Sequence, residues 1–147
     1  MRAERRAEVV WEGDLAQGSG RIVSTGSGAF GDLGVSWTAR TEEPDGSTSP
    51  EELIAAAHAS CFSMALSNGL AQAGHAPERL DVRAVCTFEQ VDGGWRITTM
   101  ELDVTGRVPG MDEAAFEQAA EQAKDGCPVS KALEGNVEMT VTPKLEA

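Results

Sequence analysis

Apolar and polar residues alternate in short runs over the first 48 residues, and clusters of glycine, serine and aspartate separate these runs. The runs cover residues 7–11, 20–24 and 35–40. Alternation with a period of two is typical of strands with one buried face, and glycine-rich clusters between them are typical of turns. We therefore predict three strands of an antiparallel sheet in this part of the chain.

A long run of small and apolar residues follows, with a complete set of helix start signals. Ser49 is predicted at the N-cap, Pro50 at the first helical position, and Glu52 three residues beyond the cap closes a capping box. Gly74 is predicted to end the helix. Because its first half carries almost no charge beyond the cap, we expect this helix in the core or in a subunit interface.

Two further strands, over 79–91 and 95–108, flank the hairpin signature Asp92-Gly93-Gly94. The remaining predicted elements are a helix over 112–124, a short helix over 127–133 and a strand over 136–142. This order lacks regular β-α-β alternation, so the sequence predicts the α+β class.

The length of 147 residues is within the usual size of one domain. We predict a single domain over 1–147, made of N-terminal strands (1–48), a central helix (49–74) and a C-terminal αβ part (79–147). Asp and Glu number 24 against 12 Lys and Arg, a formal charge of −12. Such a surface repels phosphate backbones and anionic lipids, so neither nucleic acid nor a membrane is an expected partner.

The N-terminal segment is charged and lacks the apolar run of a signal peptide, and we expect no membrane-spanning stretch of 18 apolar residues anywhere in the chain. The expected location is the cytoplasm. Thiols are kept reduced there, and the three cysteines are far apart at irregular spacings, so the sequence does not predict a structural disulfide framework. Any disulfide is expected to be transient.

The cysteines differ in their predicted surroundings. Cys61 lies in the middle of the long helix and Cys86 in a strand, where a thiol is usually a small buried hydrophobe. Cys127 precedes Pro128 at the predicted N-cap of a short helix, where unpaired backbone N–H groups stabilise a thiolate. The residues alone therefore favour Cys127 as the more acidic thiol, and they leave open whether Cys61 is inert packing or half of a redox pair.

Metal and nucleotide sites are not predicted. His58 and Cys61 share one helical face with Cys127 as a third candidate ligand, but the chain has no Cys-x-x-Cys pair and too few ligands for a closed zinc site. The glycine-rich stretches 18–20 and 26–28 open no helix and lack the Lys-Ser/Thr of a phosphate loop.

Three segments carry a family resemblance: Trp-Glu-Gly-Asp at 11–14, the helix block at 49–67, and Gly-Cys-Pro-Val-Ser at 126–130. Together they resemble the OsmC (osmotically inducible protein C) branch of the OsmC and organic hydroperoxide resistance family, and the similarity covers essentially the whole chain. The resemblance implies an intertwined homodimer of α+β subunits, with antiparallel sheets wrapped around long central helices. It also implies a peroxidase in oxidative and osmotic stress defence that works without metal, flavin or haem.

The same resemblance implies roles for two thiols. Cys61 corresponds to the peroxidatic thiol, which reduces an organic hydroperoxide to an alcohol and becomes a sulfenic acid, and Cys127 corresponds to the resolving thiol. The resulting disulfide implies an external dithiol reductant, either a lipoylated or thioredoxin-like protein or a small dithiol. A family-type arginine beside Cys61 would reverse the order of acidity expected from the cap position of Cys127.

In the family pattern this arginine is held by a carboxylate near the start of the long helix. Arg40 matches the OsmC-type position, and Arg21 resembles the position used in the hydroperoxide-resistance branch; we prefer Arg40. For the carboxylate we prefer Glu51, since Glu52 is assigned to the capping box. His58, one turn from the reactive thiol, is expected to have a packing or hydrogen-bonding role rather than an obligatory acid–base role.

Two rival functions remain at this stage. One is a non-catalytic dimeric protein that binds a small apolar ligand and uses its cysteines as core packing. The other is a thiol-disulfide oxidoreductase that acts on proteins, although the lack of a Cys-x-x-Cys motif counts against it.

Overall fold

The computed structural model describes residues 1–146, and these form two compact units. Unit 1 consists of residues 1–53, and unit 2 begins at Ile54. The single domain over the whole chain stays a prediction.

Unit 1 is built on a three-stranded antiparallel sheet in the order β1-β2-β3. Its strands are β1 (Ala7–Glu12), β2 (Ser19–Thr25) and β3 (Leu33–Val35). The first two predicted strands are confirmed to within a residue or two at each end.

The third predicted strand, over 35–40, is wrong for most of its length. β3 ends at Val35, and Trp37–Thr41 form the short helix α1. Ser36 caps this helix, because its Oγ accepts a hydrogen bond from the backbone N–H of Ala39 at 3.0 Å. Over so short a segment the apolar pattern fits a strand and a helix equally well. The serine cap favours the helix.

Helix α2 (Pro50–Gln72) begins and ends close to the predicted residues. Ser49 Oγ accepts from the backbone N–H of Glu52 at 3.1 Å, as an N-cap does. The Glu52 carboxylate accepts from the Thr48 hydroxyl at 2.7 Å, so the Ser49 half of the predicted capping box is observed and Glu52 has a different partner. At the other end Gly74 takes a φ of +87°, the left-handed conformation that terminates helices.

By length and composition α2 meets the requirements of a membrane-crossing helix. It has 23 residues, its most apolar window has a mean hydropathy of 1.3, and 22% of that window is buried. Core helices pass the same test of length and composition, so the expectation that the chain has no membrane-spanning stretch stays a prediction. The face of α2 that carries Phe62, Leu66 and Leu70 nevertheless packs in the protein core.

The sheet of unit 2 has the order β4-β5-β6. β4 (Arg79–Val91) and β5 (Gly94–Arg107) form the predicted antiparallel hairpin. Asp92 (φ +52°) and Gly93 (φ +81°) both take the left-handed conformation that tight hairpin turns require.

The last strand, β6 (Glu138–Leu145), pairs in parallel with β5, so the sheet is mixed and not purely antiparallel as expected. The reason is the connection between the two strands, which consists of α3 (Glu113–Gly126) and α4 (Pro128–Leu133). A helical crossover returns the chain to the end of the sheet from which β5 started, and the next strand must then run parallel to β5.

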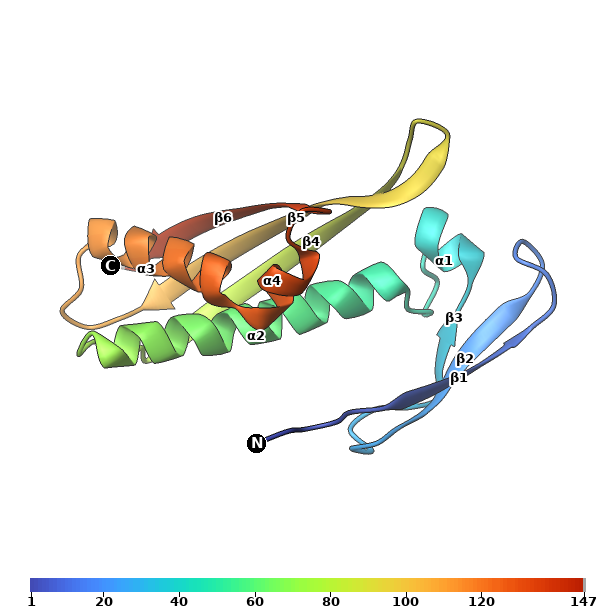
Figure 1. Ribbon diagram of the computed structural model, residues 1–147, viewed down its shortest axis with the longest axis horizontal. Helices are drawn as coiled ribbons and strands as arrows, with labels where there is room; N and C mark the ends of the chain where they lie inside the picture. The colour runs from blue at the N-terminus through green and yellow to red at the C-terminus, as the bar shows by residue number, and fades with distance from the viewer. Residues whose placement is uncertain (147) are drawn as a thin grey trace. The chain divides into compact units, whose positions relative to one another are not determined.

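Helices α2 and α3 lie on one side of the sheet of unit 2 (Figure 1). Both helices contribute side chains to one core with β5. The centre of this core comprises Phe62, Leu66, Leu70, Met100, Leu102, Val104, Val108, Phe116, Ala120 and Ala123. All of these residues lie in unit 2. The core thus fixes both α2, which carries Cys61, and the α3–α4 junction, which carries Cys127.

Candidate active site

Two of the three cysteines lie next to each other in unit 2. Cys61 is in the middle of α2, and Cys127 ends α3 and caps α4, as predicted for the Gly-Cys-Pro turn. Their thiols are free and interact with each other through a hydrogen bond. Cys127 is fully buried, whereas Cys61 is partly exposed. Cys86, the third cysteine, lies on β4.

The two thiols differ in acidity within the chain. Burial, a hydrogen bond with Cys127 and the nearby charge of that residue raise the pKa of Cys61, against a smaller opposing effect of the Val129 backbone. Burial by itself would raise the pKa of Cys127, but hydrogen bonds from Cys61, from Ser130 and from the Val129 backbone lower it below its ordinary value. This is the order predicted from the cap position of Cys127.

A buried histidine lies one turn before Cys61 on α2. His58 is fully buried, and its Nε2 lies 2.7 Å from the hydroxyl of Ser130 on α4, which is 2% exposed. Burial lowers the pKa of His58, so its ring is neutral at neutral pH. His58 thus makes a buried hydrogen bond with Ser130, and the choice between a hydrogen-bonding and an acid–base role stays a prediction. Within residues 1–146, no three His, Cys, Asp or Glu side chains are grouped as a metal site.

The expected arginine–carboxylate pair lies in unit 1. Arg40 on α1 donates from its Nε at 3.2 Å to both carboxylate oxygens of Glu51, and from a terminal nitrogen at 2.6 Å to one of them. Glu51 is 6% exposed, and the guanidinium also lies 5.7 Å from the centre of the Trp37 ring. A two-pronged contact with a buried carboxylate fixes the plane of a guanidinium. Glu51 is therefore a carboxylate partner of Arg40.

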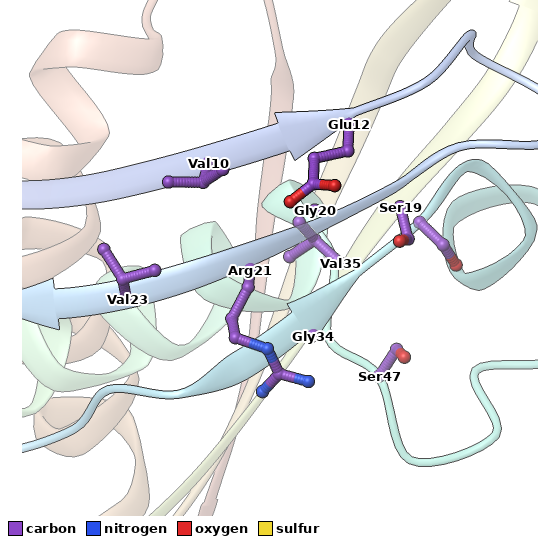
Figure 2. A pocket seen from close by; sticks show the side chains of 10 residues that line it. Val10, Glu12, Ser19, Gly20, Arg21, Val23, Gly34, Val35 and Ser47 are labelled. Atoms are coloured by element: carbon purple, nitrogen blue, oxygen red, sulfur yellow. The ribbon is translucent and has the colours of Figure 1, made fainter.

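The alternative arginine has a more open setting. Arg21 on β2 lines a shallow pocket of unit 1 together with Glu12, Ser19 and Ser47 (Figure 2). It donates at 2.9 Å to the carboxylate and to the backbone carbonyl of Asp32, whose side chain is largely exposed. An exposed ion pair orients its members weakly. Of the two arginines, Arg40 is the less exposed, and its carboxylate partner is the more buried.

Ser130 is the contact residue to which the sequence analysis gave no role. It was part of the segment that carries the family resemblance, and one further signal was available. Position 130 lies three residues after the Cys127 cap, in the first turn of α4, where side chains lie close to the cap residue.

The chain matches the family model described as OsmC-like protein over residues 43–142. It is 42% identical to the peroxiredoxin OsmC of Escherichia coli, over 93% of this chain and 94% of that protein. It is 29% identical to the organic hydroperoxide resistance protein OhrA of Bacillus subtilis, over 83% of this chain and 85% of that protein.

Solved structures show the same fold. The crystal structure of the organic hydroperoxide resistance protein OhrB of Bacillus subtilis aligns with a TM-score of 0.71 and 26% identity, over 96% of this chain and 98% of that one. The α+β class and the OsmC-like architecture predicted from the sequence are thereby confirmed. From the family-model match and the near full-length relative, the chain belongs to the OsmC-like protein family.

Proposed function

We propose that this protein is a thiol-dependent peroxidase that reduces organic hydroperoxides to alcohols in peroxide defence. The observation that carries the proposal is the contact between the thiols of Cys61 and Cys127, two residues from different helices. Relatives named peroxiredoxin and organic hydroperoxide resistance protein support a role in peroxide defence. A free thiol pair of this kind suits a reaction that opens and closes a disulfide.

The proposed reaction begins at Cys61, the more exposed of the two thiols. Its thiolate attacks the terminal oxygen of the hydroperoxide, the O–O bond breaks, and the alkoxide takes up a proton and leaves as an alcohol. Cys61 is now a sulfenic acid. The Cys127 sulfur attacks it, the S–S bond forms, and the displaced hydroxide leaves as water. An external dithiol then reduces the disulfide by thiol–disulfide exchange.

The proposal assigns Arg40 and Glu51 to the first step. The guanidinium would stabilise the Cys61 thiolate and the charge that develops on the peroxide oxygens. Within the chain the pKa of Cys61 is raised and that of Cys127 is lowered, so the proposed mechanism requires a cation at Cys61 to reverse this order. The buried contact with Glu51 suits Arg40 for this task, because it holds the guanidinium in one orientation.

We also propose that the protein works in the cytoplasm as an intertwined homodimer, regenerated by a lipoylated or thioredoxin-like protein or by a small dithiol. Support for the dimer comes from the exposed face of α2, which presents small and apolar side chains at Ala56, Ala57, Ser60 and Met64. Met64 alone is 70% exposed, and exposed apolar faces of this kind are typical of subunit interfaces.

The test is mass spectrometry after one equivalent of cumene hydroperoxide is added to the reduced protein. We expect a Cys61–Cys127 disulfide, the same disulfide in Cys86→Ser, and none in Cys61→Ser. A ligand-binding protein with structural cysteines would form no disulfide, and a protein oxidoreductase would react faster with protein disulfides than with the hydroperoxide. Either of these results would contradict the proposal.

A second measurement concerns the substrate. Turnover of cumene hydroperoxide should exceed turnover of hydrogen peroxide at equal concentration, because burial of an organic tail away from water lowers the free energy of the complex. A clear preference for hydrogen peroxide would contradict the assignment of organic hydroperoxides as the substrate class.

A further inference from the structure

His58 has an unusual position for a histidine without a catalytic role in the proposed reaction. It is fully buried, its Nε2 lies 2.7 Å from the Ser130 hydroxyl, and its Nδ1 is buried with no hydrogen-bond partner among the described residues. A buried nitrogen without a partner destabilises a fold, whereas an apolar side chain of similar size would not. The position therefore indicates that Nε2, the nitrogen that faces Ser130, has a function.

Ser130 links this nitrogen to the thiol pair. Its hydroxyl lies 2.7 Å from His58 Nε2, and its side chain also hydrogen-bonds to Cys127. Cys127 in turn interacts with Cys61. An unbroken series of polar contacts thus runs from the ring of His58 through Ser130 to Cys127 and Cys61. Its first three members, His58, Ser130 and Cys127, are almost completely shielded from solvent.

The hydroxyl of Ser130 can serve both neighbours in two ways. In one arrangement the thiol donates to Ser130 Oγ, and the Ser130 hydroxyl donates to an unprotonated Nε2. In the other, a protonated Nε2 donates to Ser130 Oγ, and the hydroxyl donates to the Cys127 thiolate. The two arrangements differ by the transfer of one proton from Cys127 to His58, and Ser130 ends with a hydroxyl in both.

We propose that His58 and Ser130 form a buried proton relay. The relay removes the proton of the Cys127 thiol during disulfide formation. The inference rests on the proposed function and deepens it. As the Cys127 sulfur attacks the Cys61 sulfenic acid, its proton moves to Ser130 Oγ and the Ser130 proton moves to His58 Nε2. The S–S bond forms, the S–O bond breaks, and the leaving hydroxide receives the proton back through Ser130, so that water forms and His58 is neutral again.

The burial of the relay explains why Cys127 needs it. Cys127 is fully buried, so bulk water has no direct access to take its proton. The groups that face its sulfur are Cys61 on α2, the Ser130 hydroxyl, and the backbone N–H groups of Val129 and Ser130. Of these side chains only Ser130 leads on to a base, and that base is His58.

The first experiment measures the thiolate of Cys127 alone, so it does not depend on peroxidase activity. In a Cys61→Ser, Cys86→Ser background Cys127 is the only cysteine, and its thiolate is followed by ultraviolet absorbance against pH. Ser130→Ala should lower the thiolate fraction near neutral pH about tenfold, since it removes a hydrogen bond to the charged form. Ser130→Thr, which keeps a hydroxyl, should restore most of the loss. Ser63→Ala, which removes a hydroxyl bonded within α2, is the matched control.

The second experiment measures proton transfer. In the Cys86→Ser protein a single turnover with cumene hydroperoxide is followed by trapping the Cys61 sulfenic acid with a cyclic dicarbonyl reagent and by mass spectrometry of the disulfide. His58→Gln keeps a side-chain nitrogen that can bond Ser130 but does not titrate. It should slow disulfide formation about 10²-fold, prolong the sulfenic acid and flatten the pH dependence of this step, while the first oxidation keeps its rate.

The outcomes separate the relay from the peroxidase assignment. Unchanged disulfide formation in His58→Gln, or a Cys127 titration in Ser130→Ala that equals the Ser63→Ala control, would overturn the relay. A wild-type protein that forms no sulfenic acid would overturn the proposed function, and the titration of Cys127 would still decide whether Ser130 acts on its proton. If Ser130→Ala does not fold, the comparison of Ser130→Thr with His58→Gln carries the test.

Discussion

The two units of the chain are stabilised in different ways. The ten residues at the centre of the hydrophobic core all belong to unit 2. In unit 1 the buried apolar residues are Ile22 and Ala39, and every residue of β1 is exposed. Unit 2 is therefore shaped by apolar burial, whereas unit 1 depends on strand pairing, helix caps and ion pairs.

The candidate site residues also differ between the two units in what holds them. Cys61 and Cys127 come from helices that are anchored in the core of unit 2, so their separation is fixed by packing. Arg40 is held by polar contacts with Glu51 and by the ring of Trp37. We infer that substitutions in the core of unit 2 will act mainly on stability, and that substitutions around Arg40 will act mainly on activity. Four predictions test this difference, in order of decreasing effect.

The largest effect is expected from Phe116→Ala in the core of unit 2. Phe116 is fully buried, and its ring lies directly against Gly106, where an added Cβ would approach within 2.5 Å. The truncation should lower the free energy of unfolding by about 3–5 kcal/mol in urea denaturation. Val10→Ala in unit 1, where the side chain is 49% exposed, should cost less than about 0.5 kcal/mol. A loss at Val10 as large as that at Phe116 would break the comparison, since unit 1 would then be equally buried in solution.

The second effect concerns activity. Arg40→Gln should lower kcat/KM for cumene hydroperoxide about 10²–10³-fold, since it removes a cation from developing negative charge. Arg40→Lys should rescue little, because an ammonium group cannot reproduce the two-pronged contact with Glu51. Arg21→Gln is the matched control and should change kcat/KM far less. A larger loss in Arg21→Gln than in Arg40→Gln would show that the arginine of the hydroperoxide-resistance branch has been retained here instead.

The sequence predicts best those features that local chemistry determines. Ser49 and Gly74 mark the two ends of α2, and Asp92-Gly93 forms the predicted hairpin turn, because caps and left-handed residues act within a few positions. The strand predicted over residues 35–40 is wrong, since an apolar pattern this short does not distinguish a strand from one helical turn, and the Ser36 cap favours the helix. The direction of β6 depends on a crossover of two helices, and no local pattern encodes it.

The candidate site shows the same limit. The acidity of Cys127 followed from its place before Pro128, and the choice of Glu51 over Glu52 followed from the helix cap. The contact between His58 and Ser130 joins residues 72 positions apart, and it depends on how α4 packs near α2. The sequence therefore could not predict that His58 is buried and that its pKa is lowered.

The third prediction uses this histidine to measure the burial of unit 2. Because burial lowers the pKa of His58, the unfolded chain binds a proton in a range of pH where the folded chain does not. Its contribution to stability is complete above the unfolded pKa of about 6.5 and is lost as pH falls through the lower folded pKa. The free energy of unfolding should fall more steeply below pH 6.5 in the wild type than in His58→Gln, by at most about 1.4 kcal/mol per pH unit.

Carboxylates contribute equally to both proteins, so the difference between the two curves isolates His58. Parallel curves would mean that His58 titrates as it does in water. In that case the helical part of unit 2 would open to solvent more readily than its core residues suggest, and the contrast between the units would weaken.

The smallest effect comes from a pair of matched helix caps, one in each unit. Asp112 caps α3 by accepting from the Ala115 N–H at 2.8 Å, and Ser36 caps α1 in the same manner. Asp112→Ala should lower the free energy of unfolding by about 1 kcal/mol without changing kcat/KM, since α3 remains held by the core. Ser36→Ala should affect global unfolding less but lower kcat/KM, because a helix of five residues has little stability of its own and carries Arg40. If both variants lost stability and kept activity, the orientation of Arg40 would not depend on α1, and unit 1 would be as rigidly packed as unit 2.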